Sequence, residues 1–143
     1  PHTDETMVTN WRAQGYTNLH LNGAIHSLNN NSYAKPFLDY FNWKNSGAAL
    51  YKMDTGDILP THKDHYITYQ RVFNITDPSS IWRVIVFMED WKSGHYFEIE
   101  NKPIVEWRRG DYVMWNYDID HMVFNMGIEP RYTLQITGTL NAN

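Results

Sequence analysis

The sequence contains no cysteine, which excludes disulfide bonds and thiolate metal sites. It also lacks an apolar run long enough to cross a membrane and a signal-peptide pattern at its first residues, so we expect no membrane association and a cytoplasmic location. The 12 lysines and arginines are scattered along the chain, and the net charge is −4. A nucleic-acid partner, which would require a basic cluster, is therefore not expected.

Aromatic side chains are abundant in this chain and make up 15% of its 143 residues. This length is sufficient for one domain with a real hydrophobic core, and no second domain is needed. We therefore expect a single domain over residues 1–143, with a β core over about 47–140.

The first part of the chain shows little periodic structure. Residues 1–30 are polar and irregular, and we expect coil there with at most one short strand. Residues 32–43 predict a helix, because Ser32 can cap it, Pro36 suits a first turn and an apolar stripe follows.

From Gly47 onward, short runs rich in β-branched and aromatic residues alternate with turn residues. The predicted strands cover residues 48–54, 59–64, 68–75, 82–89, 96–100, 104–107, 112–117, 121–125 and 132–140. Their spacing favours an antiparallel sandwich or barrel over alternating strand and helix units. The expected fold is mostly β, a jelly roll with an N-terminal helix.

The last predicted strand alternates in a way that allows two interpretations. Tyr132, Leu134 and Ile136 form one face of it. The other face carries Arg131, Thr133, Gln135 and Thr137. An edge strand in contact with solvent has this pattern, and so has a strand that lines a polar pocket inside a small jelly roll.

The main candidate site combines His62 and Asp64 with the distant His121. Residues two apart on a strand face the same side, so His62 and Asp64 can bind one ion together. His121 would complete a set of two histidines and one carboxylate that leaves positions open on the metal. The His-x-Asp pair is weak alone, since about one match arises by chance and His2-Thr3-Asp4 is another. The terminal match is set aside because chain ends fray.

Arg131 follows His121 by ten residues, and Thr133 lies two further on. The pattern His62-x-Asp64, His121 and Arg131-x-Thr133 resembles the Fe(II)/2-oxoglutarate-dependent oxygenases, which have a double-stranded β-helix of cupin-like type. The resemblance runs from about residue 50 to residue 139. The spacing around His62 also resembles the aspartyl/asparaginyl β-hydroxylase branch, which has a hydroxyl residue eleven before this histidine and an arginine nine after it.

The resemblance implies roles for seven residues. His62, Asp64 and His121 would hold Fe(II). Arg131 would bind the distal carboxylate of 2-oxoglutarate, with Thr133 beside it. Tyr51 and Arg71 occupy the branch-specific positions, and would contact 2-oxoglutarate or the substrate. The implied reaction is hydroxylation of a small molecule, an amino acid or a peptide side chain, with succinate and carbon dioxide as co-products.

The sequence departs from these relatives in two ways. The aspartyl hydroxylase branch usually lacks the metal carboxylate, whereas Asp64 is present here. The Gly-Gly-x-Leu-x-Phe signature of prolyl hydroxylases is replaced by the segment from Trp91 to Phe97. Two alternatives therefore stay open: a cupin-type metal enzyme that does not use 2-oxoglutarate, and a non-catalytic jelly-roll module whose aromatics bind carbohydrate or peptide. Residues 1–46 match no known pattern and are expected to form part of a substrate wall.

Overall fold

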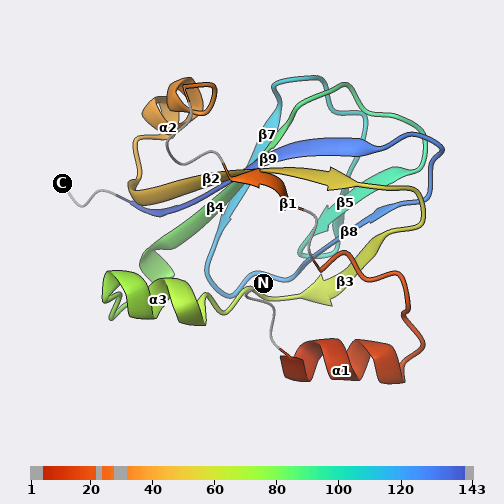
Figure 1. Cartoon of the computed structure of the whole chain (residues 1–143), viewed down its shortest axis with the longest axis horizontal. Coiled ribbons are helices and arrows are strands. Elements are labelled where there is room, and N and C mark those ends of the chain that lie inside the picture. The colour runs from red at the N-terminus through yellow and green to blue at the C-terminus, as the bar shows by residue number, and fades with distance from the viewer. Residues whose placement is uncertain (1–4, 22–23, 28–31, 141–143) are drawn as a thin grey trace.

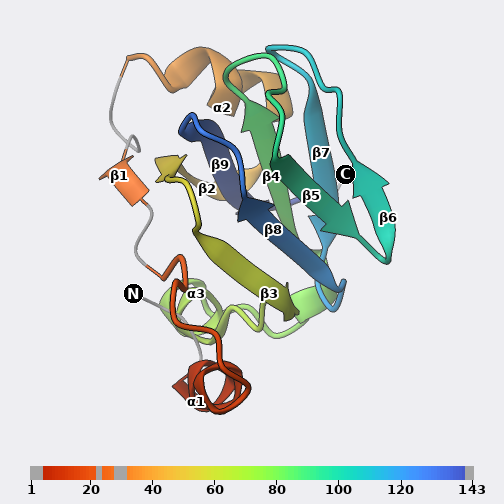
Figure 2. The same ribbon diagram turned by 90° about the vertical axis from the view of Figure 1, so that its right-hand side faces the viewer.

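Two antiparallel β-sheets face each other in a computed structural model that describes residues 5–21, 24–27 and 32–140. The five-stranded sheet has the order β1-β2-β9-β4-β7, and the four-stranded sheet the order β3-β8-β5-β6. In Figure 2 the four-stranded sheet lies in front of the five-stranded one. The predicted mostly β fold, a jelly roll of double-stranded β-helix type, is confirmed.

The strands follow the predicted segments closely, with shifts of a few residues at their ends. The larger sheet contains β1 (Ala24–Ser27), β2 (Lys44–Met53), β4 (Ile81–Phe87), β7 (Tyr112–Asn116) and β9 (Arg131–Thr139). The smaller sheet contains β3 (Ile58–His62), β5 (His95–Ile99), β6 (Lys102–Ile104) and β8 (His121–Asn125). A 3-10 turn, Pro78–Ser80, leads into β4.

Three α-helices lie outside the sheets (Figure 1): α1 (Glu5–Ala13), α2 (Lys35–Phe41) and α3 (Ile67–Phe73). Helix α2 is the predicted one, begun near Pro36, and Figure 1 shows it apart from α1, at the opposite side of the molecule. Helix α1 lies in a region that we expected to be coil. None of the described helices has the length and apolar character needed to cross a membrane.

The prediction of a strand at residues 68–75 is wrong, since α3 occupies this segment. Its sequence is rich in β-branched and aromatic residues, which favour strands in general. Left-handed residues flank the segment, Tyr66 at φ 54° and Asn74 at φ 52°. The Tyr69 hydroxyl donates to the Asn45 carbonyl at 3.0 Å. Because the segment joins neither of the two described sheets, it satisfies its backbone internally.

Strand β9 lies between β2 and β4, so the edge-strand interpretation of its polar face is wrong. Leu134 and Ile136 are fully buried on the outer face, in the cluster against which residues of α2 pack. The alternate residues, including Thr133, face the space between the sheets. That space also holds an apolar core: Met53, Ile85, Phe87, Phe97, Trp107, Trp115 and Val123. Polar side chains of β9 therefore share the interior with large aromatics.

The turn between β8 and β9 is fixed by backbone contact with the loop before β5. The amide of Met126 donates to the Gly94 carbonyl at 2.9 Å. The carboxamide of the fully buried Asn125 donates to the carbonyls of Met53 and Glu129, and accepts from the amide of Gly127. Both amide protons and the oxygen of this side chain thus hold the turn, which sets where β9 begins.

Replacing Gly94 with alanine should lower the free energy of unfolding by about 3 kcal/mol or more, because two backbones touch here. A Cβ at Gly94 would lie 2.3 Å from the amide nitrogen of Gly127. Gly110 is the matched control, since its φ of +90° is close to the +88° of Gly94 and its Cβ would meet nothing within 4 Å. Gly110→Ala should cost about 1–2 kcal/mol, the left-handed strain alone. Urea denaturation measures both variants, and equal losses would contradict the proposed clash.

Candidate functional site

The three predicted metal ligands converge at one end of the barrel. His62 ends β3 and pairs directly with His121, the first residue of β8. Asp64 follows in the loop after β3, so the predicted strand is two residues too long. The candidate ligand atoms of the three residues lie within 4.8 Å of one another. Both imidazoles are almost fully buried, and the Asp64 side chain is 18% exposed.

Backbone carbonyls orient both imidazoles in the same way. Nδ1 of His62 lies 2.7 Å from the Pro60 carbonyl, and Nδ1 of His121 lies 3.0 Å from the Ile119 carbonyl. A carbonyl oxygen can only accept, so each Nδ1 must carry a proton. The Nε2 atoms are the ones that face Asp64, at 3.5 and 3.2 Å. Two imidazole nitrogens and a carboxylate directed at one point form a donor set that could hold a metal ion.

Arg83 of β4 supplies a permanent positive charge beside this group. Its Nη1 donates to Oδ2 of Asp64 at 2.9 Å, and its Nε donates to the Thr137 hydroxyl at 3.0 Å. Burial alone would raise the pKa of Asp64, but the Arg83 guanidinium and the adjoining His121 and His62 outweigh it. The net effect holds the pKa of Asp64 well below its ordinary value. Asp64 is therefore a carboxylate at neutral pH, ready to bind a cation.

Aromatic rings complete the surroundings of the triad, by which we mean His62, Asp64 and His121. The Tyr66 ring lies under the guanidinium of Arg83, 4.8 Å from its central carbon. Trp115 contacts His121 with ring centroids 4.8 Å apart, and the edge of Trp11 meets His62 at 5.6 Å. The indole N–H of Trp115 is buried and has no hydrogen-bond partner in the described part of the chain. These rings keep bulk water away from the ligand atoms.

Arg131 lies inside the barrel, 7% exposed, and forms no ion pair with the acidic residues that the structure describes. Its guanidinium carbon lies 5.7–5.8 Å from the ring centroids of Phe87, Phe97 and Trp107. Its Nε has no hydrogen-bond partner among the described residues. Burial lowers the pKa of Arg131 to about 9, so the group still carries its charge at neutral pH. Among the described ion pairs, none joins Arg131 to Glu129 or Asp120.

The layer of side chains around Arg131 adjoins the layer that holds the triad. Phe97 pairs with Val123, and Ile99 pairs with His121, two residues along the same two strands. Two residues of a strand span about 6.8 Å. The ring of Phe97, which the guanidinium contacts, is thus one such step along β5 and β8 from the pair that contains His121.

The other predicted cofactor residues are only partly brought together. Thr133 is buried on β9, the strand that carries Arg131, and it pairs with Tyr51 of the neighbouring β2. The Tyr51 hydroxyl accepts a hydrogen bond from Gln135 at 3.4 Å. Arg71 lies exposed in the last turn of α3, and no described contact joins it to the triad. Because this segment is a helix instead of a strand, the arginine beside Asp64 is Arg83.

Three features of the site were not predicted from the sequence: the ion pair of Arg83 with Asp64, the unpaired indole N–H of Trp115, and helix α1. Arg83 stands in a strand of apolar residues, between Trp82 and Val84, where an arginine must be paired if the strand is buried. That is a signal that the sequence does contain. The sequence signal for α1 is weaker, because Trp11 is the single buried residue of an otherwise polar helix.

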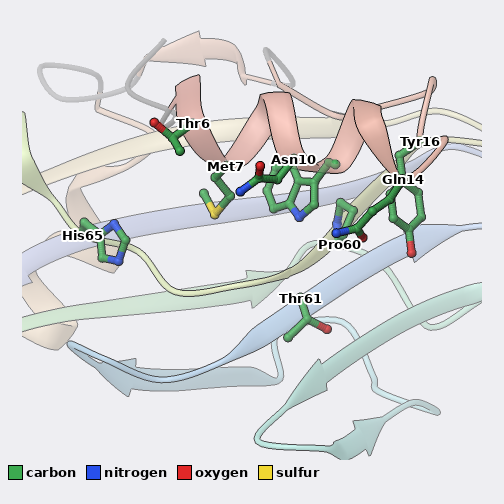
Figure 3. Close-up of a pocket in the computed structure, with 9 residues that line it drawn as sticks. Thr6, Met7, Asn10, Gln14, Tyr16, Pro60, Thr61 and His65 are labelled. Atoms are coloured by element: carbon green, nitrogen blue, oxygen red, sulfur yellow. The ribbon is translucent and has the colours of Figure 1, made fainter.

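Among the hollows in the described part of the chain are two that neither the triad nor Arg131 lines. One, of about 520 Å³, lies between α1 and β3 and includes Trp11 and His65 (Figure 3). The second, of about 400 Å³, lies near Trp107 and Tyr112. The first adjoins the triad through Trp11, which contacts His62, and through His65, which follows Asp64.

No protein-family model matches this sequence, and no curated protein is similar to it. Solved structures are similar in fold. A cupin protein from Bacteroides fragilis aligns over 74% of this chain and 75% of its own, at 11% identity and a TM-score of 0.49. A cupin domain of an XRE-family transcriptional regulator from Enterobacter cloacae aligns over 68% of this chain and 84% of its own, at 9% identity and a TM-score of 0.49. A predicted oxalate decarboxylase from Thermotoga maritima aligns over 66% of this chain and 66% of its own, at 15% identity and a TM-score of 0.47. At these values the likeness assigns no activity.

Divalent metal should stabilise this protein through the triad, because its two imidazole nitrogens and carboxylate oxygen lie close enough to bind one cation together. We expect Co(II) added to chelator-treated protein to raise the melting temperature and to give a visible d–d absorption band. The variant His62→Ala should lose both effects. His65→Ala, which removes a neighbouring histidine outside the triad, should keep them. Equal responses of the two variants would contradict the assigned ligand set.

Arg83→Met should lower the free energy of unfolding of metal-free protein by about 3 kcal/mol, because it leaves the Asp64 carboxylate buried without its cation. The double variant Arg83→Met with Asp64→Asn should recover most of this loss. Urea denaturation at pH 7 provides the measurement. A double variant as unstable as Arg83→Met alone would show that Arg83 acts through packing.

Proposed function

We propose that this protein is an Fe(II)- and 2-oxoglutarate-dependent dioxygenase that hydroxylates a small molecule or an amino-acid side chain. The observation that carries the proposal is the pairing of a two-histidine, one-carboxylate group with a buried arginine that lacks an anionic partner among the described residues. A buried charge without a partner is costly, and a ligand carboxylate would satisfy it. Neither feature alone would distinguish this activity from other metal sites.

The residues present fit the metal and the co-substrate. Nε2 of His62, Nε2 of His121 and a carboxylate oxygen of Asp64 form a donor set suited to Fe(II). When bound there, Fe(II) would supply the dioxygen chemistry in which one oxygen atom enters succinate, formed with carbon dioxide, and the other enters the product as a hydroxyl group. The protein contributes position, charge and exclusion of water.

The chain's own groups would orient the co-substrate. Arg131 would bind the distal carboxylate with a charge-assisted hydrogen bond, which its free Nε–H can donate. Thr133 and Tyr51 lie on the adjoining strand positions and offer hydroxyl groups. The separation of one layer between the surroundings of Arg131 and the triad matches a short dicarboxylate. Arg83 would keep Asp64 ionised and fixed in place while the ligand exchanges.

A cupin-type metal enzyme that does not use 2-oxoglutarate is the second candidate. The observation in its favour is that Arg131 packs against three aromatic rings and lines neither of the two hollows. In that case the cation–π contacts would be the final partners of the guanidinium. The two functions differ in whether Arg131 responds to a dicarboxylate.

The test combines turnover with stability. Purified protein with Fe(II) should convert 2-oxoglutarate to succinate, and Asp64→Ala should abolish this conversion. With metal bound, 2-oxoglutarate at a hundredfold excess over its Kd should stabilise the protein by about 2.7 kcal/mol. Arg131→Met should lose this stabilisation. The same variant without ligand should be more stable than the parent by about 1–4 kcal/mol, since an unpaired buried charge is removed.

Arg71→Met is the matched control, because Arg71 is exposed and makes no described contact with the triad. It should retain both turnover and the ligand response. Stabilisation by 2-oxoglutarate that survives in Arg131→Met would overturn the assignment of the co-substrate site, and a parent protein that 2-oxoglutarate does not stabilise would favour the second candidate.

A further inference from the structure

The hollow between α1 and β3 has the features of a binding site for an extended peptide. We propose that it binds three to four residues of such a peptide through its backbone amides, and delivers a side chain to the triad. Delivery for hydroxylation rests on the proposed function, whereas peptide binding itself does not.

The groove is lined by neutral groups from two elements (Figure 3). From α1 and the turn after it come Thr6, Met7, Asn10, Trp11, Gln14 and Tyr16, and the opposite wall consists of Pro60, Thr61 and His65. No carboxylate, lysine or arginine is among these lining residues. The lining therefore selects an uncharged ligand with many hydrogen-bonding groups.

Two carboxamides on α1 supply the recognition. Asn10 and Gln14 are one helical turn apart, both are exposed, and neither side chain makes a hydrogen bond with the described residues. Figure 3 shows both on the groove side of α1, with Gln14 near Pro60. Each carboxamide carries a donor and an acceptor, as a peptide unit does, so it can pair with the N–H and C=O of a backbone.

The spacing of these carboxamides matches an extended chain. Residues four apart on a helix are separated by about 6 Å along its axis. Two residues of an extended peptide span about 6.6–6.8 Å. Asn10 and Gln14 can therefore pair with alternate peptide units. From Thr6 to Gln14 the helix extends about 12 Å, the length of three to four extended residues.

The backbone of β3, on the opposite wall, is poorly suited to pair with an added strand. Strand β3 is an edge strand, but Pro60 has no N–H and its carbonyl lies at hydrogen-bond distance from the His62 ring. Backbone recognition is thus left mainly to the side chains of α1. A carbohydrate that stacks along the groove would require more than one exposed aromatic ring, whereas Tyr16 is 37% exposed and Trp11, in contact with His62, is 5% exposed. The observations therefore favour a peptide over an oligosaccharide.

The groove leads to the triad at one end. Figure 3 shows His65 near Met7 and Thr6, away from Gln14 and Tyr16. His65 follows the ligand Asp64 directly in the chain. A peptide side chain at the Met7 end would lie next to the triad, while the Gln14 end would hold the remainder of the peptide.

The experiment begins with a library of capped eight-residue peptides, randomised at every position and selected on immobilised full-length protein in EDTA without 2-oxoglutarate. The best fluorescent peptide is then measured by polarisation. Asn10→Ala and Gln14→Ala should each weaken binding at least tenfold. Arg12→Ala, an exposed change on the same helix outside the groove, should leave binding within twofold.

Backbone N-methylation of the selected peptide supplies a second readout. Methyl groups on alternate residues should abolish binding, and methyl groups on the intervening residues should be tolerated. The proposal would be overturned by failure to enrich any peptide, by equal effects of Arg12→Ala and Gln14→Ala, or by binding of a cello-oligosaccharide in its place. If the selected peptide binds with the expected pattern but is not hydroxylated with Fe(II) and 2-oxoglutarate, the groove assignment holds and the proposed function fails.

Discussion

The ion pair between Arg83 and Asp64 is the interaction on which the candidate site depends. Two imidazoles, fixed by the carbonyls of Pro60 and Ile119, turn their Nε2 atoms toward one carboxylate. Such an arrangement keeps Asp64 ionised in the interior only if a permanent cation lies beside it. Arg83 is that cation, and its bond to Thr137 ties the site to the central strand of the larger sheet. The three candidate ligands are thus held in place by the fold itself.

The barrel interior contains two arginines in opposite situations. Arg83 is neutralised by Asp64, whereas Arg131 has only the faces of aromatic rings among the described residues. Cation–π contacts compensate a buried charge in part, and they leave the N–H groups without acceptors. An interior that retains one uncompensated cation sacrifices stability at that position. Under the proposed function, an anionic co-substrate bound to Arg131 would compensate this charge.

Much of this site was predictable because it rests on strand periodicity and on spacing. The period of two along residues 131–137 is enough to separate Arg131 and Thr133 from Leu134 and Ile136. Contact between remote segments, in contrast, leaves no local pattern. The spacing from His62 selects Arg71, whereas in the structure α3 is a helix and the arginine beside Asp64 is Arg83. Residues 5–13 form a helix although their polar sequence gives no strong periodic signal, since Trp11 anchors them on His62. Tertiary contacts override local preference in both cases.

Pro60 has a consequence for how copies of this chain meet. An exposed edge strand is a template on which another molecule can add its own strand, and sheets that grow in this way become aggregates. In β3 the proline removes one donor from the free edge, and the bulge between Leu59 and His62 breaks its regular course. Residues 18–20 already bridge the same edge at Ile58, so the rim of the barrel next to the triad is a poor template for the strand of another copy.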